Sequence, residues 1–447
     1  MKIAQVFFLF FCVQIGFGQQ LHFEGEAEVF GLVSNEETLP FWLYTNTSTA
    51  VAPETNFSGI LGAKLVYAYE NVIIEAGATG FYRNGVADEV QRRDLYASFQ
   101  NTWLRATLGA KERATVLYGL STTNKNILWS QNARPLPGLI LEANDPLKIS
   151  ETFAVDWGIA HYSLNDDRFV DNTRIHYKRL GLITTFNERN KLTVQLQHFA
   201  QWGGTSPVEG ELPSDFEAFF DVFLAKKRPL VTQDIIYNNA LGNHLGSFLL
   251  EYELKTSMGT VSLFHEHIFE DGSGTRWANF PDGVWGLFYQ PTNGKFINAV
   301  LYEYVDTAKQ SGIGGGSGID NYFSNNLYRS GWTYERNIIG IPFILADPDL
   351  LITDSNNPIF NNRVKAHHIG VSGHFKGVAW MVKTSFVSNL GTYRVPFEPT
   401  MRNVHNYASA AYATQKFGTF TILGGLDFSN YGNTNVGGGL GYSYSFK

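Results

Sequence analysis

Apolar and polar residues alternate with a period of two through most of this chain, and this pattern limits the fold more than any other feature. Residues 191–199 read KLTVQLQHF, in which Leu192, Val194 and Leu196 alternate with polar residues. Residues 439–447, GLGYSYSFK, alternate in the same way, with glycine and serine on the second face. Successive side chains of a β-strand point to opposite faces, so these segments predict strands with one apolar face and one small or polar face.

Composition helps to decide between a soluble β-sandwich and a membrane barrel, since alternating strands build both. The 447 residues include 35 Phe, 22 Tyr, 9 Trp and 44 Gly, yet the mean hydropathy is only −0.14. No stretch approaches the roughly 18 consecutive apolar residues of a membrane helix. No linker divides the chain into smaller domains, and Phe446 stands next to the C-terminus, as in barrel insertion signals. We predict an all-β fold, a transmembrane antiparallel β-barrel in the outer membrane of a Gram-negative bacterium.

The N-terminal residues 1–18, MKIAQVFFLFFCVQIGFG, have the layout of a secretory signal. A single lysine precedes an apolar run that is too short to span a membrane, and the small residue Gly18 ends it. We expect cleavage after Gly18 and one barrel domain over residues 19–447. Cys12, the only cysteine, leaves with the signal, so the sequence predicts no disulfide, thiol catalysis or cysteine-bound metal in the mature chain.

Connection lengths indicate how the strands are arranged. Tight turns are predicted near 70–71, 101–102, 187–190, 257–258, 291–294, 376–377 and 417–418. Long connections are predicted at 34–54, 83–92, 111–136, 204–243, 270–282, 306–327, 346–362 and 391–403. Outer-membrane barrels have short periplasmic turns and long outer loops. With a further strand near 139–143 and a turn near 144–148, we expect an even number of roughly 18 to 20 strands, and two periplasmic termini.

One segment has helical periodicity. Residues 213–227 read PSDFEAFFDVFLAKK, in which Pro213, Ser214 and Asp215 form a helix start and phenylalanines recur at helical spacing. The sequence predicts a short amphipathic helix here. It is a candidate for plugging the barrel, whereas the alternation of turns and loops places it in an outer connection, where its role would be packing.

The stretch 318–337, GIDNYFSNNLYRSGWTYERN, is rich in aromatic, amide and arginine side chains. Together with SGWTYERNIIGIPF at 330–343, RIHYKRLGLIT at 174–184 and HFAQWGG at 198–204, it resembles the capsule assembly proteins of the Wzi family, over most of the chain. The resemblance implies an outer-membrane barrel of about 18 strands that is blocked by helices and inward loops. It also implies a lectin-like role, in which the protein attaches capsular polysaccharide to the cell surface.

A polysaccharide-binding role gives this stretch a chemical purpose. Sugars present C–H faces to aromatic rings and hydroxyl groups to fixed donors and acceptors. The predicted stacking rings are Tyr322, Tyr328, Trp332 and Tyr334. The predicted hydrogen-bonding groups are Asp320, Asn321, Asn325 and Asn326, and the predicted partners of acidic sugars are Arg329 and Arg336. The alternative is structural, because Asn and Gly also form turns, and Tyr and Trp also form belts at membrane interfaces.

The formal net charge of −7 gives no basic footprint, so we expect no nucleic-acid partner. This charge repels an acidic polymer at long range, but salt screens it beyond a Debye length of about 8 Å. Basic clusters at 92–93 and 226–228, and the two arginines named above, would then act locally.

Signals for metal or cofactor chemistry are weak. His265 and His267 of HEHIFED share a strand face with Glu270 or Asp271 nearby, but spacing fixes no third ligand. GIGGGSG at 312–318 lacks the Lys-Ser or Lys-Thr of a phosphate-binding loop. The sequence predicts no metal site, no cofactor and no enzyme.

The leading hypothesis is a non-enzymatic outer-membrane barrel that binds surface polysaccharide and assists capsule assembly. One alternative is a porin for small solutes, which needs an open lumen. Another is a glycan-active enzyme, whose pair of carboxylates the sequence does not locate. The expected partners are capsular or other surface polysaccharide, outer-membrane lipid and, at the periplasmic turns, the polysaccharide export machinery.

Overall fold

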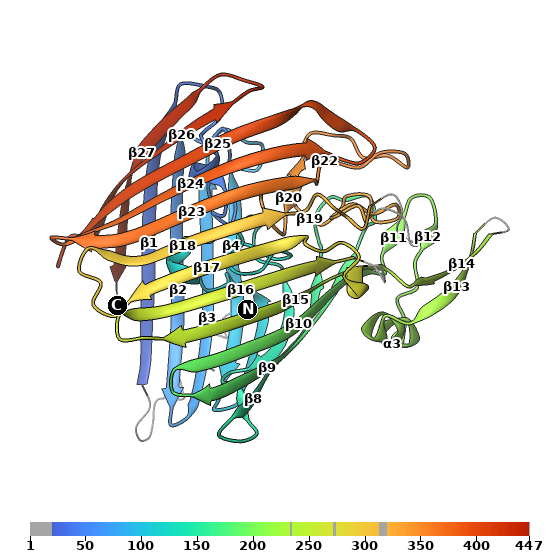
Figure 1. The fold of residues 1–447 in the computed structure, drawn as a ribbon, viewed down its shortest axis with the longest axis horizontal. Helices are drawn as coiled ribbons and strands as arrows, with labels where there is room; N and C mark the ends of the chain where they lie inside the picture. The colour runs from blue at the N-terminus through green and yellow to red at the C-terminus, as the bar shows by residue number, and fades with distance from the viewer. Residues whose placement is uncertain (1–19, 233–234, 271–273, 313–319, 447) are drawn as a thin grey trace, which may run out of the picture.

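In the computed structural model, which describes residues 20–232, 235–270, 274–312 and 320–446, the alternating segments form one closed β-barrel (Figure 1). Consecutive barrel strands are antiparallel, and the last strand, β27 (Asn435–Phe446), pairs with the first, β1 (Gln20–Ser34). The sheet has 19 strands, but β6 (Gly138–Ala143) and β7 (Leu147–Lys148) both pair with β8 and form one interrupted strand, so 18 strands surround the lumen. This confirms the predicted barrel and its strand number. The predicted signal peptide lies outside the described residues.

The other barrel strands are β2 (Phe57–Tyr69), β3 (Val72–Arg83), β4 (Val90–Gln100), β5 (Leu104–Ala110), β8 (Phe153–Ser163), β9 (Arg174–Asn187), β10 (Asn190–Trp202), β15 (Asn243–Lys255), β16 (Gly259–Phe269), β17 (Gly283–Pro291), β18 (Ile297–Asp306), β23 (Val364–Phe375), β24 (Val378–Gly391), β25 (Pro396–Ala413) and β26 (Thr419–Ser429). The connections contain helices α2 (Phe41–Tyr44) and α3 (Phe216–Leu224), the short turns η1 (Leu117–Gly119) and η2 (Gly274–Arg276), and the strand pairs β11 (Thr205–Ser206) with β12 (Gly210–Glu211), β13 (Lys227–Thr232) with β14 (Ile235–Ala240), β19 (Thr333–Tyr334) with β20 (Asn337–Ile338), and β21 (Leu345–Ala346) with β22 (Ile359–Asn361).

Short turns lie at the end of the barrel that holds Gln20 and Phe446, the first and last described residues, and long connections lie at the other end, as predicted. The turn predicted near 144–148 is four residues further along, where Ile149 N and Ser150 N donate to Phe153 O at 2.9 and 3.1 Å. The loops predicted at 306–327 and 346–362 belong to a single connection between β18 and β23. A long connection at 163–174 was not predicted, and the one predicted at 391–403 ends earlier, because β25 begins at Pro396.

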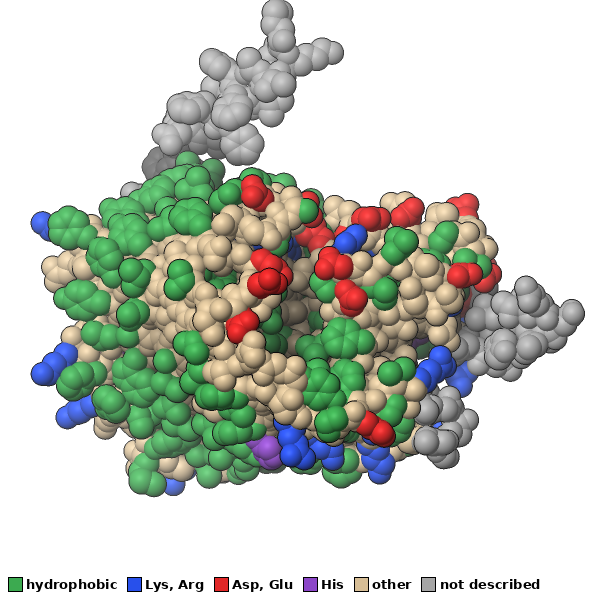
Figure 2. All heavy atoms as spheres, turned by 90° about the horizontal axis from the view of Figure 1, so that it is seen from above, with side chains coloured by type: hydrophobic (Ala, Val, Ile, Leu, Met, Phe, Trp, Pro, Cys, Tyr) green, Lys and Arg blue, Asp and Glu red, His purple; other side chains and the backbone are tan. Residues whose placement is uncertain are grey.

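The outward face of the strands is a belt of exposed aliphatic and aromatic side chains. Leu61 is 66% exposed, Leu108 is 62%, Leu180 is 60% and Leu440 is 68%. In Figure 2 hydrophobic side chains cover much of one side of the face shown. Such a belt faces acyl chains in an outer-membrane barrel. None of the helices in the described ranges has the length and apolar character needed to cross a membrane.

Three long connections fold back into the lumen, and we call them together the plug: 35–56, 111–137 and the described parts of the third, 307–312 and 320–363. Leu120, Ile127 and Trp332 of the plug form one buried cluster with inward-facing wall residues such as Phe199 and Phe264. The inward-facing wall residues that contact the plug are therefore buried by protein, whereas the belt residues of the outward face are exposed.

Carboxylates of the barrel wall hold the plug segment 111–137 in place. Glu303 of β18 accepts hydrogen bonds from Ser121 Oγ at 2.6 Å, and from Thr122 N and Thr122 Oγ1 at 2.8 and 2.7 Å. Glu266 of β16 accepts one from Ile127 N at 2.8 Å. Both carboxylates are buried, so these bonds are charge-assisted contacts shielded from water.

The predicted helix exists as α3, but it lies outside the lumen and is no part of the plug (Figure 1). It packs on Ala200 and Trp202, which alternate along β10 with the lumen-facing Phe199 and Gln201. Because successive side chains of a strand point to opposite faces, α3 covers the outer wall. The plug contains α2 and loop segments instead.

Candidate functional site

The described part of the aromatic stretch, 320–337, lies in the plug, and the four rings predicted to stack on sugars are buried there. Tyr322 and Trp332 are 0% exposed, Tyr334 is 1% and Tyr328 is 3%. A stacking ring must present a face to its ligand. The structure places these four faces in the packing core of the plug, and their role in stacking on sugars stays a prediction.

The polar tips of these rings all have partners inside the protein. Tyr322 Oη donates to Asp282 Oδ2 at 2.8 Å, and Trp332 Nε1 donates to Leu128 O at 2.6 Å. Tyr328 Oη donates to Gly203 O at 3.3 Å, and Tyr334 Oη donates to Asn165 Oδ1 at 2.8 Å. Tyr and Trp suit such a core because they combine a large apolar ring with one hydrogen-bonding group.

Two of the predicted hydrogen-bonding groups serve the plug. Asp320 is 5% exposed and accepts a hydrogen bond from Ser311 Oγ at 2.6 Å. Asn325 donates to Asn243 Oδ1 at 3.0 Å and accepts from two backbone N–H groups of its own turn. Asn321 and Asn326 are exposed, and Asn321 Oδ1 accepts a hydrogen bond from Asn362 Nδ2 at 2.7 Å.

The two predicted arginines differ. Arg329 is half-buried and lines neither of the two pockets described below. Arg336 is exposed, and it sits with Glu335 in the two-residue turn between β19 and β20, where both residues have positive φ (64° and 47°). Its Nη1 donates to Pro348 O at 3.0 Å, and its Nη2 lies 3.9 Å from Asp167 Oδ2. The hairpin thus presents Arg336 at the outer end of the plug.

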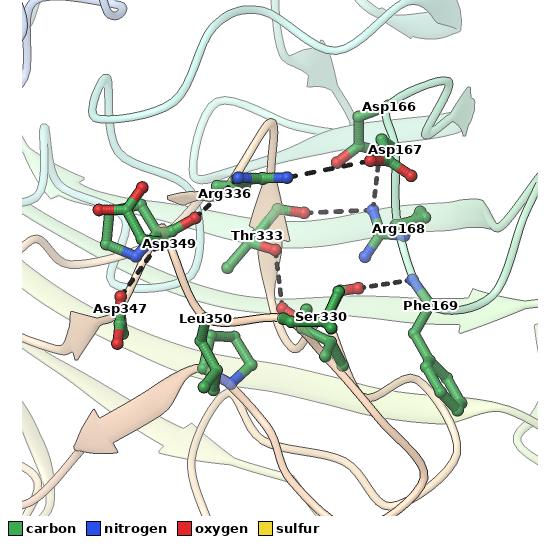
Figure 3. A pocket seen from close by; sticks show the side chains of 14 residues that line it. Asp166, Asp167, Arg168, Phe169, Ser330, Thr333, Arg336, Asp347, Asp349 and Leu350 are labelled. Carbon is green, nitrogen blue, oxygen red and sulfur yellow. Dashed lines mark hydrogen bonds and ion pairs between the residues drawn. The ribbon is translucent and has the colours of Figure 1, made fainter. Parts of the chain in front are cut away.

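Arg336 lines two neighbouring pockets among the long connections. The small pocket, of about 230 Å³, lies between the connection 163–174, the β19–β20 hairpin and residues 347–358 (Figure 3). Phe169 N donates to Ser330 Oγ at 2.9 Å, and Arg168 donates to Thr333 O and Gly331 O at 3.3 and 3.4 Å. These bonds attach the connection 163–174, which comes from the barrel wall, to the plug.

The electrostatics of the small pocket are dominated by a buried ion pair. Arg168 Nη1 lies 3.2 Å from Asp166 Oδ1, and Asp166 Oδ2 accepts a hydrogen bond from Glu335 N at 2.8 Å. Burial raises the pKa of Asp166, and the neighbouring Arg168 guanidinium opposes this. Burial also lowers the pKa of Arg168. The pair is a rigid support rather than a free recognition group.

The large pocket, of about 580 Å³, lies between α2, the connection 83–90 and residues 335–349. Phe41 and the half-buried Tyr44 of α2 supply aromatic surface, and Pro342 and Ile344 supply aliphatic surface. Polar lining comes from Glu54, Arg83, Asp88, Asn132, Glu335, Arg336, Asn337 and Asp349. A pocket of a few hundred Å³ with an apolar floor and convergent polar groups is typical of small-ligand and sugar sites.

Local structure explains why α2 presents Tyr44. Phe41 N donates to Asp427 Oδ2 of β26 at 2.7 Å, and the Phe41 ring stacks on His405 of β25 at 4.4 Å. The ring of Tyr44 meets Phe41 edge-on at 5.9 Å. The one-turn helix is thus fixed to the inner wall at its first residue, and Tyr44 at its last residue lines the pocket.

The pocket residues that sequence reasoning missed lie in short polar turns. NDDR at 165–168 supplies Asp166, Asp167 and Arg168, and DPD at 347–349 supplies two more carboxylates. The sequence signal that could have pointed to them is a pair of acidic residues next to an arginine, in a loop to which no function had been given. Tyr44 had no signal of this kind, because only the fold brings residues 41–44 beside 335–349.

His265 and His267 share the outward face of β16, as their spacing predicts. Their rings stack on Trp285 and Trp277 at centroid distances of 3.7 and 4.1 Å. Within the described residues, no three His, Cys, Asp or Glu side chains come close enough to hold a metal ion.

Fold and lumen together define the class of this protein, a plugged outer-membrane β-barrel with pockets among its outer loops. A model of the capsule assembly protein Wzi family matches residues 41–343, and the chain belongs to this family. No curated protein matches it in sequence.

Three solved structures illustrate the similarity of fold. Wzi from Escherichia coli, described as an outer-membrane protein involved in group 1 capsule assembly and a carbohydrate-binding β-barrel, shares 13% identity with a TM-score of 0.63, over 95% of this chain and 84% of that chain. Pseudomonas aeruginosa OpdQ shares 10% identity with a TM-score of 0.49, over 96% and 97% of the two chains. Acinetobacter baumannii OccAB4 shares 10% identity with a TM-score of 0.48, over 95% and 98%.

Proposed function

We propose that this protein binds a surface polysaccharide at the outer end of its plug and thereby helps to assemble a capsule or similar coat on the cell, without acting as an enzyme. The observation that carries the proposal is the large pocket, which combines the half-buried ring of Tyr44 with a polar rim among the long connections. Sugars need this combination of a flat ring and fixed hydrogen-bonding groups. Membership of the Wzi family, one of whose members is described as a carbohydrate-binding barrel, supports the same function.

The charges around the pockets favour a particular class of polymer. Carboxylates outnumber arginines among the lining residues: Glu54, Asp88, Asp166, Asp167, Glu335, Asp347 and Asp349 against Arg83, Arg168 and Arg336. Figure 2 shows acidic side chains gathered around a hollow in the face it displays. A strongly acidic polymer would bring its own negative charges close to these carboxylates, and this repulsion disfavours its binding. We therefore infer a polymer recognised mainly through hydroxyl and amide groups, with Arg336 available to an isolated acidic group and Asn321 and Asn326 available at the surface.

Purified protein in detergent micelles tests the pocket directly, with capsular polysaccharide from the source strain as the probe in a surface-based binding assay. Tyr44→Ala and Arg336→Ala should each weaken binding roughly 10-fold, a loss of about 1.4 kcal/mol. The matched controls are Tyr431→Ala and Arg394→Ala, exposed residues at the same end that line neither pocket. Equal losses in controls and pocket variants would contradict the assignment of the site.

A cellular experiment tests the role itself. Deletion of the gene should shift polysaccharide from the cell-bound to the shed fraction, and the wild-type gene should restore it. Complementation with Tyr44→Ala should restore less than complementation with Tyr431→Ala. If the polymer stays attached in the deletion strain, the role in attachment is wrong.

Two measurements separate this function from its alternatives. The protein in planar bilayers should give no steady open channels, because the plug occupies the lumen; steady conductance would favour a porin. Incubation with purified capsule should release no reducing ends, whereas sustained release would favour a glycan-active enzyme.

The short turns at the end that holds Gln20 and Phe446 remain the proposed contact with export machinery, and crosslinking from these turns is the test.

A further inference from the structure

Helix α3 has an exposed apolar stripe on the outside of the barrel. Phe216 is 77% exposed, Phe220 is 48% and Leu224 is 65%. These residues are spaced four apart and therefore lie on one face of the helix. The rings of Phe216 and Phe220 meet edge-on at 4.9 Å, so the stripe is continuous.

The opposite face holds the helix firmly on the outer wall. Ala218 and Val222 are 3% and 0% exposed and pack on Ala200 and Trp202 of β10. On β9, His176 lies edge-on to Phe219 at 5.4 Å. The side chain of Lys178 donates to Phe223 O, and its Nζ lies 4.5 Å from the Phe223 ring. The exposed stripe is thus not the result of a loosely attached loop.

The local sequence fixes both ends of α3. Asp215 caps its first turn, accepting a hydrogen bond from Ala218 N at 2.8 Å, and Ala225 ends it in the left-handed conformation with φ 49°. The stripe therefore has a defined length and a fixed direction on the barrel surface.

The position of α3 relates it to the lipid-facing belt. Along β9 and β10, the outward pair Leu180 and Leu196 is exposed at 60% and 41%. In the next outward pair, Lys178 and His198, the lysine contacts the helix and the histidine is 7% exposed. The helix thus begins where the exposed aliphatic belt ends, at the end of the barrel with the long connections. The exposed apolar stripe of α3 continues the belt. Both surfaces therefore require an apolar neighbour of the same kind.

Charge points to the same neighbour. Lys226 and Lys227 follow the C-terminal end of α3 directly, and both are exposed. Lys226 Nζ forms an ion pair at 3.9 Å with Asp221 Oδ1, and the lysine side chain is 63% exposed. Basic residues beside an apolar helix face suit an interface of acyl chains and anionic head groups.

From these observations we propose that α3 is an interfacial helix that inserts Phe216, Phe220 and Leu224 among the acyl chains of the outer leaflet of the outer membrane, with Lys226 and Lys227 at the level of the anionic head groups. The inference depends on the fold alone and is independent of polysaccharide binding.

Site-specific fluorescence tests this insertion, because residues 19–447 contain no cysteine and each introduced cysteine is therefore a single label. A polarity-sensitive dye is attached to Phe220→Cys, with Leu224→Cys as a second site on the stripe. The labelled protein is placed in vesicles of phosphatidylcholine and phosphatidylglycerol, with spin-labelled lipid as quencher. Leu180→Cys is the lipid-facing reference, and Glu209→Cys, an exposed residue of the β11–β12 hairpin, is the solvent reference. A heat-dependent gel shift identifies correctly folded barrels.

The dyes at residues 220 and 224 should be quenched at least roughly two-fold more than the dye at residue 209, and more by a spin label near the head group than by one at the acyl-chain end. The dye at residue 180 should be quenched by both lipids. Quenching at 220 and 224 equal to that at 209 would overturn the proposal and leave a protein partner as the occupant of the stripe. Stronger quenching at 220 by the deeper spin label would overturn the interfacial position.

Discussion

Two aromatic-rich stretches of this chain meet opposite surroundings. The described part of the first stretch, 320–337, lies inside the barrel as the core of the plug, with Trp332 and Tyr322 fully buried. The helix within 213–227 lies outside the barrel, with Phe216 and Phe220 largely exposed. The rings of the first stretch include tyrosines and a tryptophan, each with a hydrogen-bonded tip, whereas all four rings of the helix are phenylalanines. Phe323 of the first stretch is also fully buried, so ring type alone does not decide the environment; a polar tip lets a ring be buried together with the backbone groups of the plug.

Removal of one ring from each stretch should show most clearly whether the two stretches differ in their contribution to stability. Trp332→Ala should lower the free energy of unfolding by about 3–5 kcal/mol, because it empties a fully buried site and removes the donor to Leu128 O. Phe216→Ala should change it by no more than about 0.5 kcal/mol in detergent. Urea titration of folded protein, followed by gel mobility, measures both. Similar losses would show that the helix contributes to the core.

Loss of the hydrogen bonds between Glu303 and the plug should give the next largest change in the free energy of unfolding. Glu303→Gln removes a buried carboxylate that accepts from Ser121 and Thr122, and it should cost about 1.5–3 kcal/mol. The plug segment 111–137 should also become more sensitive to protease. Glu253→Gln is the matched control, because its ion pair with Lys191 is partly exposed and is worth at most about 1 kcal/mol. If the protease cleaves segment 111–137 at the same rate in Glu303→Gln and in the wild type, Glu303 does not hold the plug in place.

The tip of Tyr322 predicts a pH dependence, since it donates to Asp282. Burial raises the pKa of Asp282 to about 6, although hydrogen bonds from Lys309 N, Gln310 N and Tyr322 Oη oppose this. Because the native pKa exceeds the unfolded value, the native state binds the proton more tightly. The free energy of unfolding should therefore rise by about 1 kcal/mol as the pH falls from about 7.5 to about 5. Asp282→Asn should lose this increment, and urea titrations of both proteins at the two pH values measure the difference. An identical pH response in the variant would assign it to other groups.

The smallest effect on stability is expected at the exposed arginine of the plug stretch. Arg336→Ala should leave the free energy of unfolding within about 0.5 kcal/mol of the wild-type value, since its contacts lie at the surface. The same urea titration measures it. A larger loss would place Arg336 with the buried members of the stretch and would weaken its assignment to the pockets.

The barrel was predictable because its signal is local. Alternation along KLTVQLQHF states which side chains share a face, and the structure exposes Val194 and Leu196 on the outward face. Turn and loop lengths then led to about 18 strands without any tertiary information. The interrupted strand β6–β7 was less predictable, since its continuation past residue 143 depends on pairing with β8.

The site was less predictable, because its parts meet only through the closed barrel. Tyr44 and Arg336 are far apart in sequence and line one pocket because α2 and the β19–β20 hairpin both enter the lumen. The predicted rings were drawn from a stretch whose composition suits a sugar site and a polar-tipped core equally well. Only Arg336 among the predicted site residues lines both pockets, and it belongs to a turn.

The pairing of β1 with β27 has a consequence for the order of assembly. Gly25 lies opposite Phe446, and Ser34 lies opposite Gly437, so the wall has a seam made of the first and last described strands. The plug segments are synthesised before the last strand, and they occupy the space that this seam encloses. A ribosome-released chain that lacks its final strand would have an open wall beside a hydrophobic interior. Enclosure of the plug and the pairing of β1 with β27 therefore form a single event, which requires the last described strand to be in place.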